Sequence, residues 1–158
     1  MKISNNFNQH PQNPNFGTKA NVKVKGNPYL KKSVGEIAQN GTLEDQSLLV
    51  KFINLIKSDS NINTFEMNMD VVSFTNKTVK YRYIIDGGKK EILSGQPFIN
   101  PSVFRDLADN CFLKGLSWFI KDNYGEQVYN NAVKASSKYK PEYVSSSLLS
   151  IKRQLLNS

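Results

Sequence analysis

The sequence predicts an α+β fold in which helices cover one face of a small antiparallel sheet. Three observations lead to this prediction: apolar and polar residues alternate between Ile62 and Leu93, apolar residues recur at helical spacing before and after that segment, and proline or glycine separates the patterns. Alternation is typical of strands with one buried face. Because such a sheet is marginal in water until helices pack on it, the two patterns together indicate the fold class.

The N-terminal region is expected to contain a tail and then a strand. Residues 1–15 are rich in asparagine, glutamine and proline and have too little apolar surface to offset the entropy of ordering, so we expect them to be disordered. From Phe16 to Lys25 apolar and polar residues alternate, which predicts a strand that joins the sheet as a fourth member. Residues 16–158 have the length of a single domain, with no internal repeat.

Two helices are expected between this strand and the alternating segment. Asn27-Pro28 supplies an N-cap followed by proline at the first helical position, and Asn40-Gly41 supplies a C-terminal stop. Thr42–Asp45 matches the capping-box pattern and starts the second helix. The predicted buried positions are Leu30, Val34, Ile37, Leu48, Leu49, Phe52, Ile53 and Ile56.

The alternating segment is expected to form a three-stranded meander. A three-residue loop at Thr75–Lys77 would place Met69 opposite Tyr83 and keep the apolar face continuous. The same register would place Asp70 opposite Arg82, an opposite-charge cross-strand pair.

The turns of the meander differ in how well the sequence defines them. A two-residue first loop would instead require a β-bulge near Val71 and Val72. The second turn, Asp86–Lys89, has glycine where a primed turn needs positive φ.

Three helices are expected after the sheet. Asn100-Pro101 repeats the cap-then-proline pattern and starts the strongest helix, Asn123–Gly125 breaks the pattern before a weaker helix, and Pro141 starts the last helix. The expected order is therefore β-α-α-β-β-β-α-α-α. The predicted buried positions are Phe104, Leu107, Ala108, Cys111, Phe112, Gly115, Leu116, Phe119, Val128, Ala132, Ala135, Val144, Leu148, Ile151 and Leu155.

Composition excludes several classes of function. Cys111 is the only cysteine and His10 the only histidine, which excludes an internal disulfide and a His/Cys metal cluster. Phosphate-binding glycine loops, nucleophile elbows, zinc-protease motifs and EF-hand loops are absent, so no catalytic, cofactor-binding or metal-binding residue is predicted. Without a signal-peptide core or a membrane-spanning run, a soluble cytoplasmic protein is expected.

The net charge of +8 is concentrated in the two ends of the chain. Residues 1–32 contain six lysines and no acid, and residues 134–158 contain five basic residues and one glutamate. Such segments favour polyanions or acidic surfaces as partners. The candidate polyanion-binding residues are Lys19, Lys23, Lys25, Lys31, Lys32, Lys134, Lys138 and Lys140, with Tyr139 and Tyr143 as candidates for stacking on bases.

Each of these patterns also has a purely structural interpretation. Lysines on an edge strand block edge-to-edge aggregation, and tyrosines can close a core with their hydroxyls at its rim. Glu66, Asn68 and Asp70 share one strand face, a geometry compatible with acid-base chemistry or a hard cation. Since Lys80 and Arg82 lie on the neighbouring strand, a solvated charged face is the favoured interpretation.

Three functional hypotheses follow from these observations. The first is a non-enzymatic interaction module, of unknown biological role, that binds a protein partner or an acidic surface. The second is sequence-nonspecific nucleic-acid binding through the lysine-rich ends. The third is an enzyme with a site that no motif reveals.

Overall fold

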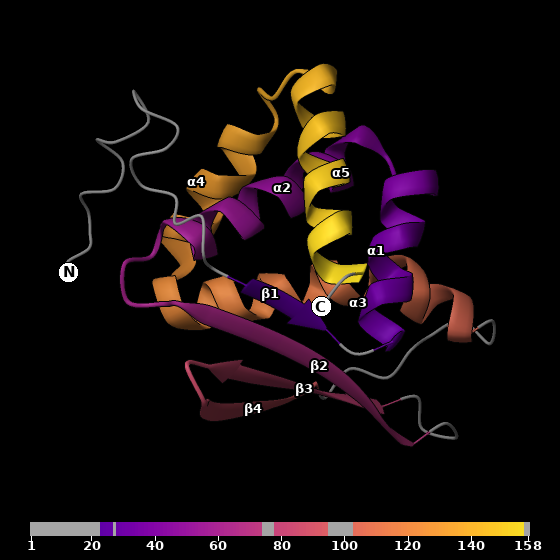
Figure 1. The fold of residues 1–158 in the computed structure, drawn as a ribbon, viewed down its shortest axis with the longest axis vertical. Coiled ribbons are helices and arrows are strands. Elements are labelled where there is room, and N and C mark those ends of the chain that lie inside the picture. Colours follow the sequence, from indigo (N-terminus) through magenta and orange to yellow (C-terminus); the bar gives the residue numbers. More distant parts are fainter. Residues whose placement is uncertain (1–22, 27, 74–77, 95–102, 157–158) are drawn as a thin grey trace.

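A computed structural model describes residues 23–26, 28–73, 78–94 and 103–156 of the chain (Figure 1). The predicted tail, residues 16–22 of the predicted first strand and the predicted cap Asn100-Pro101 lie outside these residues. The mixture of helices and strands confirms the α+β class. In chain order the elements are β1 (Lys23–Gly26), α1 (Pro28–Asn40), α2 (Leu43–Ser58), β2 (Thr64–Ser73), β3 (Thr78–Ile85), β4 (Gly88–Ser94), α3 (Val103–Tyr124), α4 (Glu126–Ser136) and α5 (Pro141–Leu156).

The strands lie side by side in the order β1-β2-β3-β4. β1 is parallel to β2, and β2, β3 and β4 pair antiparallel to one another. The helices gather on one side of the strands, with α3 next to them and α5 standing in front of α2 (Figure 1). None of the described helices is long and apolar enough to cross a membrane.

The pairing of β2 with β3 corrects the predicted register. Met69 lies opposite Tyr81 and Asp70 opposite Lys80, with a bulge between Val71 and Ser73. The predicted pairs, Met69 with Tyr83 and Asp70 with Arg82, are therefore wrong by two residues. Registers that differ by two residues bury the same side chains, so the alternation of apolar residues could not distinguish them. The bulge adds one residue to β2, close to Val71 and Val72, where a two-residue first loop was expected to require a bulge.

Helix α3 approaches the strands closely because it has a glycine at the contact. A Cβ atom at Gly115 would lie 2.9 Å from Met67 Sδ and 2.9 Å from the Tyr81 ring. The Tyr83 hydroxyl donates a hydrogen bond of 2.7 Å to the Gly115 carbonyl. Phe119 adds ring contacts, with its centroid 5.2 Å from that of Tyr83. The apolar face of β2 and β3 is thus covered by α3, and Met67 and Tyr83 are fully buried.

Local sequence signals set the ends of several elements. The Asp45 amide donates to Thr42 Oγ1 at 3.1 Å, which caps α2 as the capping-box pattern predicts. Asp86 and Gly87 both have positive φ, and the Asp86 carboxylate accepts a hydrogen bond of 2.7 Å from the Thr64 amide. Gly125 separates α3 from α4 with a φ of 94°.

Candidate functional site

The residues from Val133 to Tyr143, which we call the α4–α5 corner, contain most of the described candidate residues. Lys134, Lys138 and Lys140 are all exposed there. The end of α4, the connection and the first turn of α5 present them together, because Ser137–Lys140 is short and Pro141 restarts the helix at once.

The two candidate stacking residues of the corner have different environments. Their ring centroids lie 4.9 Å apart at 71°, an edge-to-face contact. Tyr139 packs against the core and Tyr143 is 45% exposed. Burial, with a smaller contribution from Tyr143, raises the pKa of Tyr139 to about 12. The surface of Tyr143 is therefore the part of this pair that is open to a partner.

Helix α2 supports the corner from below. Asn54 Nδ2 donates a hydrogen bond of 3.1 Å to the Tyr143 hydroxyl, so the exposed ring has a defined position. Both α4 and α5 pack against α2, and the Phe52 and Tyr129 rings are 5.8 Å apart. Tyr124 and Tyr129 also pack against the core, as the structural interpretation of the tyrosines expects.

The charges of the corner are not neutralised within it. No carboxylate of the described residues forms an ion pair with Lys134, Lys138 or Lys140. Residues 134–143 contain these three lysines and one acid, Glu142, which gives a net charge of +2. An acidic partner could therefore approach these lysines without first breaking an internal ion pair.

The remaining candidate lysines lie elsewhere. Lys23 and Lys25 belong to β1, and Lys31 and Lys32 to the first turns of the helix that follows it. β1 contacts α5, whereas the corner contains the start of α5. Pro141 and Arg153 are twelve positions apart on α5, which corresponds to about 18 Å of helix. The described candidate lysines therefore form two groups, one at the start of α5 and one at β1 and the start of α1, and Lys19 lies outside the described residues.

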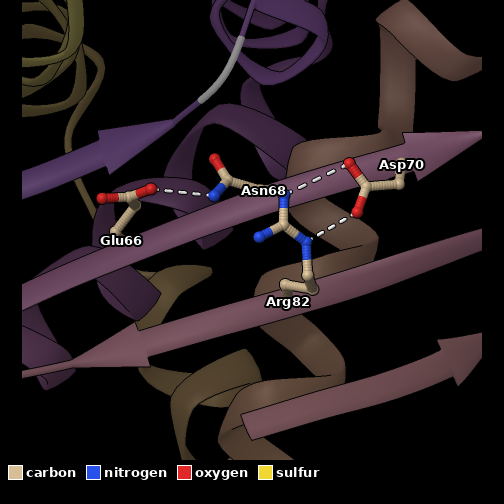
Figure 2. Close-up of polar contacts among 4 residues, drawn as sticks. All are labelled: Glu66, Asn68, Asp70 and Arg82. Atoms are coloured by element: carbon tan, nitrogen blue, oxygen red, sulfur yellow. Dashed lines mark hydrogen bonds and ion pairs between the residues drawn. The ribbon is translucent and has the colours of Figure 1, made fainter. Parts of the chain in front are cut away.

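The outer face of β2 and β3 carries a second set of charged residues (Figure 2). Asn68 Nδ2 donates to Glu66 Oε2 at 2.8 Å. Arg82 donates to both oxygens of Asp70, from Nε at 2.6 Å and from Nη2 at 3.3 Å. An opposite-charge contact between Asp70 and Arg82 is thus present, although the predicted register is wrong and the two residues lie diagonally across the strands.

These contacts favour the solvated charged face over a reactive site. The Asp70 carboxylate is held in a two-point ion pair with a guanidinium, and its side chain is 40% exposed to solvent. Where the structure is described, it contains no group of three side chains that could hold a metal ion. His10 and the side chain of Cys111 lie outside the described part. On the outer face of the sheet, the Asp70 and Glu66 carboxylates therefore already have partners in Arg82 and Asn68.

Sequence reasoning missed two features of the surface. Lys51 and Asn54 of α2 lie beside the predicted stripe, and no pattern linked them to tyrosines about ninety residues later in the chain. Trp118 of α3 is a large apolar side chain that is 41% exposed, which no sequence pattern indicated.

Comparisons of the chain with protein-family models, with curated proteins and with solved structures found no match. The residues and contacts described above are therefore the basis for assigning it a function.

Proposed function

We propose that this chain is a non-enzymatic binding module whose α4–α5 corner engages an acidic surface of a partner protein. The observation that carries the proposal is a set of exposed lysines, 134, 138 and 140, that form no ion pair with the described residues, in a corner that also exposes two apolar side chains, Val133 at 38% and Tyr143 at 45%. Interfaces commonly combine aromatic residues with a charged, solvent-accessible rim.

The proposal treats the rest of the chain as a scaffold for this surface. Residues 16–158 would form one domain, with a β2–β3–β4 meander joined by β1 beneath the helices. A cytoplasmic location is proposed because a chain with one cysteine suits a reducing compartment.

Several features favour a protein partner over a nucleic acid. The chain has 18 lysines and 3 arginines, and arginine is the residue that recognises phosphates and bases in two-point fashion. Tyr139 is half-buried against the core, which leaves only Tyr143 for stacking. An exposed aliphatic residue such as Val133 is better suited to an apolar contact with a protein.

The test is binding of fluorescently labelled poly-L-glutamate. The double substitution Lys138→Glu and Lys140→Glu should weaken binding by about tenfold or more, because it replaces attraction by repulsion at the corner. The matched control is Lys32→Glu with Arg153→Glu, which changes the net charge equally on exposed positions outside the corner. Equal losses in the two double variants would show that net charge alone drives binding and would refute the proposed surface.

Nucleic-acid binding is the competing outcome of the same experiment. It predicts that a labelled single-stranded oligonucleotide is retained more tightly than poly-L-glutamate, with affinity that falls steeply as salt increases. The substitutions Lys23→Glu and Lys25→Glu should then reduce retention as well, since they reverse the charge of β1. Tighter binding of the oligonucleotide, together with its loss in this double variant, would refute the protein-partner proposal in favour of nucleic-acid binding.

A further inference from the structure

Lys51 is a half-buried cation in the middle of α2. No described residue forms an ion pair or hydrogen bond with it. Burial lowers the pKa of its ammonium group, and no carboxylate of the described residues opposes that effect. A partly desolvated charge without a partner carries a free-energy cost that the fold itself does not explain.

The position of Lys51 connects it with the α4–α5 corner. Asn54 lies three residues further along the helix, so the two side chains are neighbours on the same side of α2. Asn54 in turn holds the Tyr143 hydroxyl at 3.1 Å. Helices α4 and α5 both pack on α2, and Figure 1 shows α2 passing between them below their connection. Lys51 therefore lies next to the support of the proposed binding surface.

A second lysine of the same helix provides a contrast. Lys57 is also half-buried, and burial lowers the pKa of its ammonium group too. It lies in the last turn of α2, where the partial negative charge of the helix end stabilises a cation. Lys51 lies six residues before Lys57, outside the last turn, and lacks this stabilisation.

We propose that Lys51 forms an ion pair with a carboxylate of the acidic partner when that partner occupies the α4–α5 corner. This inference rests on the proposed function and adds a specificity-determining residue to it. The exposed lysines attract the partner over a distance, whereas Lys51 makes the shorter, less hydrated contact beside Asn54 and Tyr143. Only a partner that has a carboxylate next to Lys51, in addition to acidic residues facing the exposed lysines, would make both kinds of contact.

The experiment compares Lys51→Met with Lys57→Met in the full-length chain, using labelled poly-L-glutamate as the probe. Methionine keeps an unbranched apolar side chain at each position but removes the charge. The expected result is a loss of affinity of about tenfold or more for Lys51→Met, as for a charged hydrogen bond, and a change within about twofold for Lys57→Met. Both variants should unfold at denaturant concentrations no lower than the parent chain.

A second readout follows the amine directly. Acetylation of Lys51 Nζ by an activated ester, measured by mass spectrometry, should be slowed severalfold by poly-L-glutamate, whereas acetylation of Lys57 should not change. Equal affinities of the two methionine variants, or equal protection of the two amines, would overturn the role of Lys51. The proposed function would still stand if the Lys138→Glu and Lys140→Glu variant had lost binding. No binding by the parent chain would overturn both proposals.

Discussion

The outer face of the sheet and the α4–α5 corner are both rich in charged residues, yet their charges are arranged differently. On the sheet, Arg82 contacts both oxygens of Asp70, and Asn68 binds Glu66. At the corner, Lys134, Lys138 and Lys140 make no ion pair with any residue in the part of the chain that is described.

The difference separates charge that is used within the fold from charge that is available to a partner. A carboxylate already paired with a guanidinium must lose that contact before it binds anything else. An exposed lysine without a partner loses only water. Charge composition alone does not show which of the two surfaces is available to a partner, whereas the contacts of the charged side chains do.

The largest expected effect tests whether packing of α3 on the apolar face of the strands stabilises the sheet more than the ion pair of its outer face does. Gly115→Ala should lower the free energy of unfolding by about 1–3 kcal/mol, because the added methyl group would overlap Met67 and Tyr81. Chemical denaturation followed by circular dichroism measures the change. Gly35→Ala in α1 is the matched control, since nothing lies within 4 Å of the added Cβ. This control should gain about 0.5–1 kcal/mol from helix propensity. A gain in both variants would mean that α3 does not pack closely on the sheet.

A smaller effect tests whether Tyr139 belongs to the core or to the binding surface. Burial and the neighbouring Tyr143 raise the pKa of Tyr139 to about 12, whereas in the unfolded chain the hydroxyl titrates near 10. Ionisation therefore favours the unfolded state: the stabilisation is complete below pH 10 and is lost as the pH rises through 12. Denaturant melts between pH 8 and pH 12 should show this loss, and Tyr139→Phe should reduce it. An unchanged pH profile in Tyr139→Phe would place that hydroxyl in solvent.

The smallest effect is expected on the charged face of the sheet. Asp70→Asn should lower the free energy of unfolding by less than about 1 kcal/mol, because the side chains of Asp70 and Arg82 are 40% and 27% exposed and water screens the pair. The same variant should bind poly-L-glutamate as the parent chain does. Tighter binding by Asp70→Asn would show that the freed Arg82 competes with the corner, and the contrast between the two surfaces would then fail.

Much of the fold could be predicted because its signals are local. Thr42 caps α2, Gly41 follows the end of α1, and Pro141 begins α5, each through a contact or a backbone angle that involves only a few residues. Met67 and Tyr83 are buried as their alternation with polar neighbours predicted. The close packing of α3 was expected from its apolar stripe, in which Gly115 occupies a core-facing position.

The features that escaped prediction depend on residues far apart in the chain. The predicted β2–β3 register was wrong because two alignments of the strands satisfy the same alternation of apolar and polar residues. Only the bulge at Val72 distinguishes them. The contact of Asn54 with Tyr143 joins residues 89 positions apart, and no periodicity encodes it. Lys51 carried no signal for the same reason, because the role proposed for it depends on which helices lie beside α2.

Gly125, at a φ of 94°, sets the direction of the chain from residue 125 to residue 158. Without that backbone conformation, α3 and α4 could continue as one helix of residues 103–136, a rod about 50 Å long. Lys134, in the last turn of that helix, would then lie far from α2 and α5. One achiral residue instead turns the polypeptide back over α2, so the placement of the proposed binding surface depends on a position that has no side chain to contribute to it.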